Sequence, residues 1–263
     1  MRTRNRHLTV TILAVAILLL LCAPLIVLFG VALNDGPQQL FPPRGLSLRW
    51  FMNIFQRDGF INAIIFSVEL ALMATVASLI LGVLAGLAIV RYRFFGRDLL
   101  MTIFMSPLIV PQVVVGMAFL MAFSAARIHS SFVALFVLHV VLALPFAIRV
   151  VVASLTRFKI SLEEAARSLG APPWKAFFLV TFPVIRTGVV SAGIFAFVAS
   201  FENFTATQFL VWDRTTLPVE IFSYVQTEND PTGAAMSAMV VIVVALLVLL
   251  LHRYISVDAL NHR

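Results

Sequence analysis

The stretch NAIIFSVELALMATVASLILGVLAGLAIV, residues 62–90, decides the fold of this chain. It contains one charged residue, Glu69, and exceeds the ~17–25 apolar residues that a helix needs to cross the hydrocarbon core of a membrane. Gly82 and Gly86 are spaced four positions apart, which suits close packing against a second helix. The stretch therefore predicts a membrane-spanning helix.

Further apolar runs lie on both sides of this stretch. The chain of 263 residues is 61% hydrophobic and only 12% charged, a balance that water-soluble domains do not have. The first run follows a basic start but is too long for the apolar part of a signal peptide, so we expect it to remain in place. We predict one all-α membrane domain, residues 1–263, with spans at about 8–33, 62–90, 99–124, 131–152, 188–210 and 234–251.

The basic residues indicate which side of the membrane each loop occupies. With six spans, 14 Lys and Arg residues lie on the side of the two termini and 5 lie on the other side. Cytoplasmic loops hold the excess of Lys and Arg, so the termini are predicted to be cytoplasmic. The net charge of +7 then reflects membrane topology, and no nucleic-acid partner is expected.

Two segments on the opposite side have the pattern of short helices in the membrane interface. Residues 46–55 mix apolar and polar positions around Trp50 and Phe51, and residues 217–226 begin with Pro218 near their first turn. Contacts with membrane lipid are expected there, and ordinary loop packing is the alternative.

The longest predicted cytoplasmic loop, 157–185, has marked local signals. Ser161 and Glu164 have the spacing of a capping box, which predicts a helix that stops at Gly170. A second short helix, from Trp174 to about Val180, is expected to end before Pro183. This pair of short helices joined by a sharp turn is a candidate for docking another protein, and packing on its own membrane domain is the alternative.

The same loop resembles the "EAA" loop of ABC importer permeases. The residues read Glu164-Ala165-Ala166, three positions, Gly170, nine positions, then Val180-Thr181-Phe182-Pro183, with Val180 and Phe182 replacing the Ile and Leu of the family pattern. The resemblance implies a type I importer permease fold and a loop that couples to an ATPase. The residues implied in coupling are Glu163, Glu164, Ala165, Ala166, Leu169, Gly170, Trp174 and Pro183.

The resemblance also implies the partners. These are a second, homologous permease subunit, a cytoplasmic ABC ATPase dimer and a periplasmic substrate-binding protein, assembled at a bacterial inner membrane. No Gly in this chain is followed by Lys, so a phosphate-binding Gly-Lys-Ser/Thr loop is absent from the sequence. ATP and Mg²⁺ are expected on the ATPase, and no catalytic site, cofactor or metal site is expected in this chain.

Polar residues within the predicted spans are candidates for the substrate pathway. Ionisable groups are costly in a membrane, so Glu69 and Glu202 are interpreted as functional, with neutralisation by a proton or by hydrogen-bonded neighbours as the alternative. Pro107 and Pro111 are expected to distort the third span beside Gln112. The pathway candidates are Glu202, Asn203, Glu69, Gln112 and Thr205; His139 is interpreted as a core histidine.

Within the family, the chain is most similar to spermidine/putrescine-type permeases, which implies a polyamine substrate. Those permeases usually have an acidic pair where this chain has Glu202-Asn203. Another small cation, an organophosphonate, ferric ion or an opine-like compound remains open. The alternatives to an importer subunit are a stand-alone secondary transporter or channel for a small cation, and a membrane-embedded enzyme.

Overall fold

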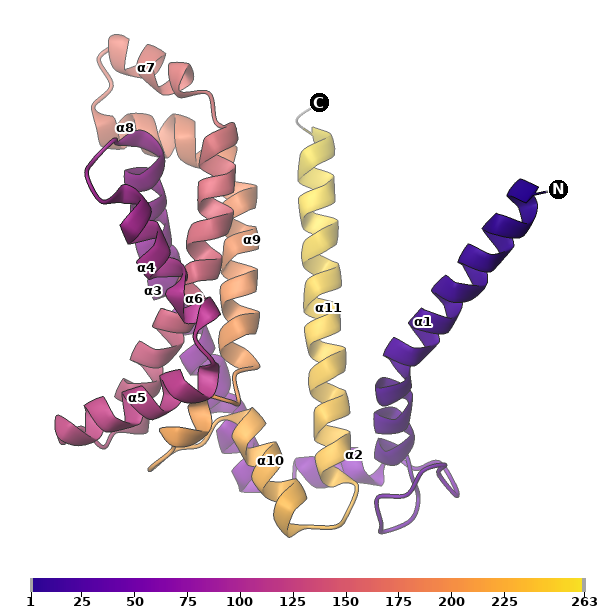
Figure 1. The fold of residues 1–263 in the computed structure, drawn as a ribbon. Coiled ribbons are helices and arrows are strands. Elements are labelled where there is room, and N and C mark those ends of the chain that lie inside the picture. Colours follow the sequence, from indigo (N-terminus) through magenta and orange to yellow (C-terminus); the bar gives the residue numbers. More distant parts are fainter. Residues whose placement is uncertain (1, 262–263) are drawn as a thin grey trace. The chain divides into compact units, whose positions relative to one another are not determined.

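The computed structural model describes residues 2–261, and its regular elements are helices (Figure 1). The elements are α1 (Arg2–Ala32), α2 (Arg49–Ile54), α3 (Asp58–Arg91), α4 (Arg97–Ile109), α5 (Gln112–Ala125), α6 (Ser131–Arg157), α7 (Ile160–Ser168), α8 (Pro173–Ala176), the π-helix η1 (Phe177–Thr181), α9 (Phe182–Phe201), the 3₁₀-helix η2 (Thr207–Phe209), α10 (Leu217–Thr227) and α11 (Thr232–Asn261). The prediction of an all-α fold is confirmed.

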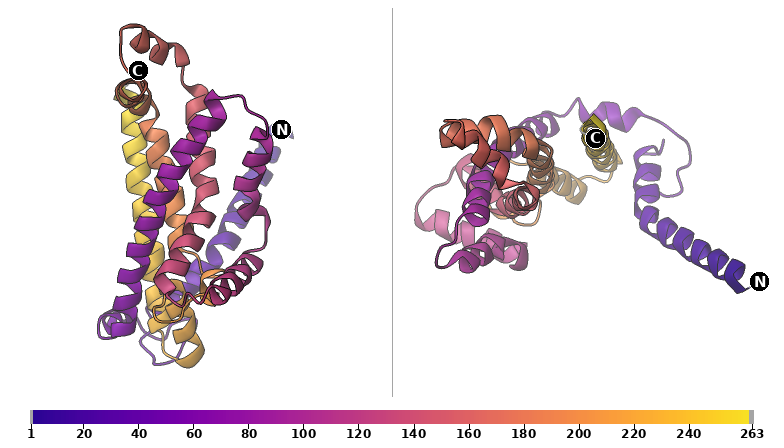
Figure 2. Two further views of the ribbon diagram at one scale, coloured as in Figure 1. Left: turned by 90° about the vertical axis from the view of Figure 1, so that its left-hand side faces the viewer. Right: turned by 90° about the horizontal axis from the view of Figure 1, so that it is seen from above.

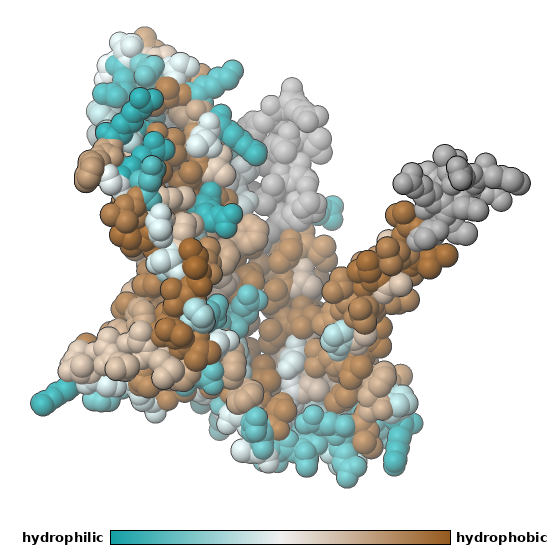
Figure 3. Space-filling model, viewed as in Figure 1, coloured by the Kyte–Doolittle hydropathy of each residue, from teal (hydrophilic) through white to brown (hydrophobic). Residues whose placement is uncertain are grey.

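Five of the described segments are long and apolar enough to cross a membrane. They are Val10–Ala32, Asp58–Arg91, Ser131–Arg157, Pro173–Phe201 and Thr232–Leu249, and α4 with α5 makes a sixth if that bent pair forms one span. Side chains on the described part of α1 and in the middle of the other long helices form hydrophobic surface, as expected for segments that face lipid (Figure 3). The sidedness of the termini stays a prediction.

The predicted third span, 99–124, is broken rather than continuous. Its two helices, α4 and α5, meet at an angle of 103°. Pro111 forces the preceding Val110 into an extended conformation, with φ −74° and ψ 133°, and this ends α4. The predicted distortion at the prolines is confirmed, and it is larger than a kink.

The predicted fifth span, 188–210, is wrong at both ends. Helical structure runs from Pro173 through η1 and α9 and ends at Phe201. Pro183 does not stop it, because the wider π-helical turn directly before Pro183 accommodates the missing N–H and the bulk of the ring. At the other end, Asn203 Oδ1 accepts a hydrogen bond from the Ala206 amide at 3.3 Å, which favours a turn over further helix.

The chain divides into two compact units. One contains the chain up to Asn62 together with Glu220–Leu247, and the second contains Ala63–Val219 and the chain from Val248 onward. Figure 2 gives two further views of the helices.

In the second unit, α6 packs between α3 and α9 (Figure 1). Two apolar clusters form this core, one around Leu70, Leu135 and Leu210 and the other around Val151 and Ile185.

The spacing of Gly82 and Gly86 has the predicted role. A Cβ atom at Gly82 would lie 2.8 Å from the Cβ of Ala147, and one at Gly86 would lie 2.9 Å from a methyl of Val151. Because real Cβ atoms do not approach so closely, glycine lets α3 and α6 pack at short range.

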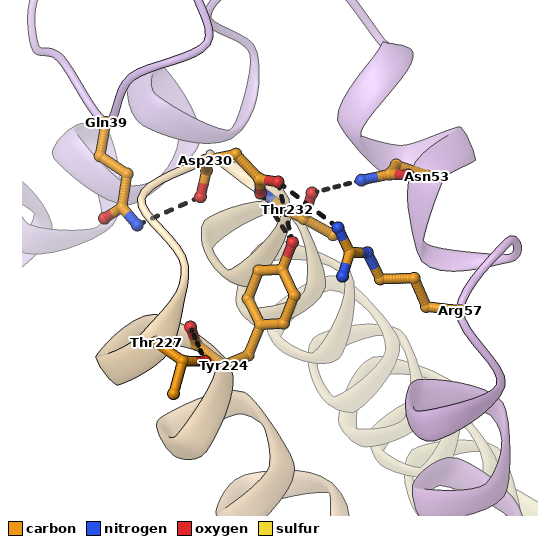
Figure 4. A network of polar contacts seen from close by, with 7 residues as sticks. All are labelled: Gln39, Asn53, Arg57, Tyr224, Thr227, Asp230 and Thr232. Atoms are coloured by element: carbon orange, nitrogen blue, oxygen red, sulfur yellow. Dashed lines mark hydrogen bonds and ion pairs between the residues drawn. The ribbon is translucent and has the colours of Figure 1, made fainter.

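In the first unit, Asp230 lies in the loop before α11 and contacts side chains or backbone from α10, from the start of α11 and from the segment that follows α2 (Figure 4). Its carboxylate accepts hydrogen bonds from the Tyr224 hydroxyl at 2.9 and 3.0 Å and from the Thr232 amide at 2.8 Å. Nη2 of Arg57 lies 3.8 Å from Oδ2 of Asp230. Burial acts to raise the pKa of Asp230, but the hydrogen bonds from Thr232 and Tyr224 and the charge of Arg57 outweigh it and lower the pKa.

Two amide side chains extend this network. Gln39 donates to the backbone carbonyl of Asp230 at 3.1 Å, and Asn53 of α2 donates to the Thr232 hydroxyl at 2.8 Å. The predicted short helix at 46–55 is present as α2, with Trp50 buried and Met52 exposed. Burial of one face and exposure of the other fit a helix that lies along a surface.

Candidate functional site

The first candidate site is the α7–α8 hairpin, residues 160–176, at one end of the second unit (Figure 1). The capping box predicted at Ser161 and Glu164 is wrong. α7 begins at Ile160 after an extended Phe158 and Lys159, so Ser161 lies inside the first turn, and the cap residue makes no side-chain hydrogen bond. Because the extended Lys159 is the N-cap residue, the helix has already started at Ile160 and Ser161 cannot cap it.

Gly170 ends α7 as predicted. It has a φ of +90°, a left-handed conformation that glycine adopts without a Cβ penalty. The Ala171 amide donates to the Ala166 carbonyl at 3.1 Å, and the Gly170 amide donates to the Arg167 carbonyl at 3.0 Å. These are the two hydrogen bonds of a Schellman motif, which sets the direction of the turn into α8.

The hairpin exposes most of its predicted coupling residues. Leu169 is 90% exposed and Trp174 is 65% exposed, and Glu164, Ala165 and Gly170 are also exposed, while Ala166 is half-buried. The remaining two differ in placement: Glu163 is buried, and Pro183 lies exposed in α9. The end of the unit that bears the hairpin is largely hydrophilic (Figure 3), so Leu169 and Trp174 are exposed apolar side chains on a polar surface.

Glu163 faces the interior of the unit instead. Its carboxylate accepts two hydrogen bonds from Arg91, at the end of α3, and one from the hydroxyl of Thr181 in η1. Sequence reasoning selected Glu163 but missed Arg91 and Thr181, which lie 72 and 18 positions away along the chain. Two signals were available: a basic residue, Arg91, directly after the predicted span 62–90, and a hydroxyl, Thr181, in the loop before the predicted span 188–210.

The second candidate site is a polar network between α6, α9, η2 and α5. His139 is buried, with Nδ1 2.7 Å from the Ser200 hydroxyl and Nε2 3.0 Å from the Thr207 hydroxyl. Thr207 donates its own proton to Asn203 Oδ1 at 3.1 Å, and Asn203 Nδ2 donates to Gln112 Oε1 at 3.2 Å. The interpretation of His139 as a core histidine is confirmed.

The donors and acceptors of this network are consistent with one histidine tautomer. Because the Thr207 proton is used toward Asn203, the Thr207 oxygen accepts from Nε2–H of His139. Nδ1 then accepts from the Ser200 hydroxyl. A neutral chain of hydrogen bonds therefore stabilises the irregular backbone that follows α9.

Beside this network lies a cavity of about 280 Å³, the Glu202 cavity. Its lining includes four of the five predicted pathway residues, namely Gln112, Glu202, Asn203 and Thr205, and it also includes Pro107. Glu202 is exposed at the C-cap of α9 and is the one ionisable residue in the lining. The cavity therefore offers one carboxylate and several neutral polar groups to a solute.

The structure does not bring Glu69 to this cavity. Glu69 lies 4.0 Å from Nη1 of Arg214, and both side chains are about half exposed. These two residues line a different cavity of about 310 Å³ together with Asp213. A cation therefore lies beside Glu69, at a distance and exposure where an ion pair is weak.

Asp213 was missed by sequence reasoning. Its Oδ1 accepts the backbone amide of Ser131 at 2.8 Å, at the start of α6. The Ser131 amide and then the Ser131 hydroxyl, as hydrogen-bond donors, hold the pKa of Asp213 below its usual value. Asp213 thus places a negative charge at the positive end of the α6 dipole.

A larger cavity of about 590 Å³ was also missed. It lies between α6 and α9, and its lining includes Arg149, Arg157, Ser154, Thr187 and Ser191. Both arginines are exposed. The lining residues contain no carboxylate, so the charge of this cavity is opposite to that of the Glu202 cavity.

The fold contains several helices long and apolar enough to cross a membrane, and the two candidate sites are a polar cavity and an exposed hairpin. Residues 78–263 match the family described as "Binding-protein-dependent transport system inner membrane component". The chain belongs to this family, and it is a permease subunit of an ABC importer. Its relatives are transport permeases rather than enzymes.

Two relatives and one solved structure illustrate the similarity. The putrescine transport system permease protein PotI of Escherichia coli (strain K12) is 30% identical over 205 residues, which cover 74% of this chain and 73% of PotI. The molybdenum transport system permease protein ModB of the same strain is 28% identical, covering 74% of this chain and 93% of ModB.

The solved structure is a bacterial ABC transporter involved in the import of the acidic polysaccharide alginate. The match has a TM-score of 0.72 and covers 95% of this chain and 96% of that chain. At 14% identity, it shows the shared fold alone.

Proposed function

We propose that this subunit forms half of a translocation pathway, paired with a second, homologous permease subunit. A cytoplasmic ABC ATPase dimer docks on the α7–α8 hairpin and supplies the energy, and a periplasmic binding protein delivers the solute. The complex lies in a bacterial inner membrane. The two permease subunits open the pathway alternately to the two sides as the ATPase closes and reopens.

The exposed hairpin is the observation that carries this proposal. Leu169 and Trp174 lie on either side of the turn at Gly170, on a hydrophilic surface. Large exposed apolar side chains on a polar surface indicate a protein interface, and tryptophan is among the residues that contribute most to binding. The charge count and the position of the EAA pattern support a cytoplasmic location for this surface.

Substitutions at the turn test the coupling role. Gly170→Pro cannot adopt a φ of +90°, and Glu164→Lys reverses a charge on the exposed face. Both variants should insert into the membrane while uptake per ATP hydrolysed falls in the reconstituted complex.

Glycine-to-alanine variants provide a matched control for backbone strain. Gly96, in the α3–α4 loop, has a φ of +83° and the same open surroundings as Gly170. Gly170→Ala should therefore impair coupling more than Gly96→Ala, although both pay the same backbone cost. Normal ATPase binding and normal uptake in Gly170→Pro and Glu164→Lys would contradict the docking role.

For the solute, we propose a small polyamine-like cation. The relationship to PotI, named as a putrescine permease, supports this class, and Glu202 supplies a carboxylate in a cavity without a competing cation. A carboxylate among neutral polar groups suits an ammonium group, which has three donors and no acceptor.

Anions are the competing class of solute, because one cavity is lined by arginines and because the chain is related to ModB, named as a molybdenum permease. Thermal shift of the cognate binding protein with putrescine, spermidine, molybdate and an organophosphonate identifies the class directly. A shift with a polyamine alone supports the proposal, and a shift with an anion alone contradicts it.

Glu202→Gln tests the pathway within this chain. If an ammonium group passes Glu202, removing the charge should lower uptake about tenfold or more, since hydrogen bonds to charged groups are the stronger ones. Glu228→Gln removes an exposed carboxylate outside the cavity and is the control. Unchanged uptake of a cationic solute in Glu202→Gln would remove Glu202 from the pathway.

A further inference from the structure

Three side chains from three different elements meet beneath the α7–α8 hairpin. Arg91 is the last residue of α3, Glu163 lies in the first turn of α7, and Thr181 is the last residue of η1. Their side chains are mostly removed from solvent: Arg91 is 18% exposed and Glu163 is 7% exposed, and Thr181 is fully buried. We call this group the clamp.

The hydrogen bonds of the clamp use both carboxylate oxygens. Arg91 Nη1 donates to Glu163 Oε1 at 2.9 Å, and Arg91 Nη2 donates to Glu163 Oε2. The Thr181 hydroxyl donates to Glu163 Oε2 and accepts from Arg91 Nη2 at 3.2 Å. A two-pronged arginine–carboxylate contact fixes orientation as well as distance, and the third residue ties this pair to the π-helix.

The two neighbouring glutamates of α7 therefore have different environments. Glu163 faces the clamp and is buried, whereas Glu164 is exposed, as is Leu169 at the C-cap of α7. Adjacent positions on a helix point about 100° apart, since 3.6 residues make one turn. One face of α7 is thus attached to the unit while the other is free for a partner.

The position of Thr181 adds a mechanical feature. Thr181 ends the π-helical turn through which α8 continues into α9. Such turns are locally wider than an α-helix and often mark functional sites. Without an attachment at this turn, the hairpin could move while α9 stays in place.

We propose that Arg91, Glu163 and Thr181 are positioning residues that make the hairpin, α3 and α9 move as one body. The proposal rests on the proposed docking of an ATPase to the hairpin. When the ATPase displaces the hairpin, the clamp transmits that displacement to α3 and α9. A complex with a broken clamp still binds the ATPase and hydrolyses ATP, but it imports little solute.

The most conservative test compares Thr181→Val with Thr181→Ser. Valine keeps the shape of threonine and removes its hydroxyl, whereas serine retains the hydroxyl. The full complex is reconstituted in proteoliposomes, and ATPase affinity, ATP hydrolysis and uptake are measured on the same samples. We expect Thr181→Val to lower uptake per ATP at least about fivefold, with ATPase affinity unchanged and Thr181→Ser close to the original protein.

Glu163→Gln and Arg91→Lys extend the test to the charged pair. Glutamine removes the charge, and lysine cannot make the two-pronged contact. Both should lower uptake per ATP as Thr181→Val does. Asp98→Asn removes an exposed carboxylate at the start of α4, outside the clamp, and is the matched control.

The outcomes separate the clamp from the docking proposal. If the original chain does not bind the ATPase, the docking proposal fails. If the original chain binds but Thr181→Val retains normal uptake per ATP, or loses ATPase affinity in proportion to uptake, the clamp proposal is overturned. An equal loss in Asp98→Asn would also overturn it, because the effect would then be one of surface charge.

Discussion

The second unit stabilises its two polar sites in different ways. Under the hairpin, the clamp joins helix ends with a charged arginine–glutamate pair and a hydroxyl. Around His139, a chain of neutral hydrogen bonds supports irregular backbone beside the Glu202 cavity. A bidentate charged pair suits an attachment that must transmit motion, whereas neutral neighbours leave Glu202 without a cation partner in its cavity.

Removing one member of the charged pair should produce the largest loss of stability. Arg91→Ala leaves the Glu163 carboxylate buried without its cation. We expect the free energy of unfolding to fall by about 3 kcal/mol. This is near the lower end of the range for broken buried ion pairs, because Arg91 is partly exposed. Unfolding of the purified subunit in bicelles measures this loss. A cost below that of His139→Leu would contradict the contrast between the two sites.

His139→Leu should have an intermediate effect. It leaves the hydroxyls of Ser200 and Thr207 without their histidine partner, and side-chain hydrogen bonds in membrane proteins are individually modest. We expect a loss of about 1–2 kcal/mol in the same assay. Val137→Ala, at an exposed position of α6, is the control and should change stability less.

The smallest effect should come from Asp213→Asn. Because the pKa of Asp213 is lowered in the folded protein, its contribution is present above the unfolded pKa of about 3.9 and is lost as the pH falls through the folded value. The protection factor of the Ser131 amide, which corrects the exchange rate for its intrinsic pH dependence, should therefore fall in acid in the original protein. Protection in Asp213→Asn should be weaker at neutral pH and lack this acid dependence; identical profiles would contradict the assignment.

Features set by local backbone chemistry could be predicted from the sequence. Gly170 ends α7 because the left-handed conformation excludes most other residues, and Pro111 breaks the third span because it forces Val110 to be extended. The apolar runs likewise predicted six spans, and the structure has five qualifying segments, or six if the bent α4–α5 pair forms one span. These features depend on a few adjacent residues.

Features set by long-range contacts could not be predicted. The capping signal at Ser161 did not set the helix start, because the extended Lys159 is the N-cap of α7. The π-helical turn before Pro183 let the next helix continue. The span predicted at 188–210 included the polar residues after Phe201, but the hydrogen bond from the Ala206 amide to Asn203 favours a turn there instead of further helix. The partners of Glu163 required knowledge of which face of α7 is buried.

The affinity of the ATPase for Trp174→Ala tests the central claim most directly. Trp174 is exposed, so its removal should leave the fold intact, while a tryptophan at the centre of an interface contributes about 2 kcal/mol or more. Phe95→Ala removes an exposed aromatic side chain from the α3–α4 loop, outside the hairpin, and is the control. We predict about 30-fold weaker ATPase binding for Trp174→Ala and little change for Phe95→Ala; equal affinities for Trp174→Ala and the original chain would contradict docking on the hairpin.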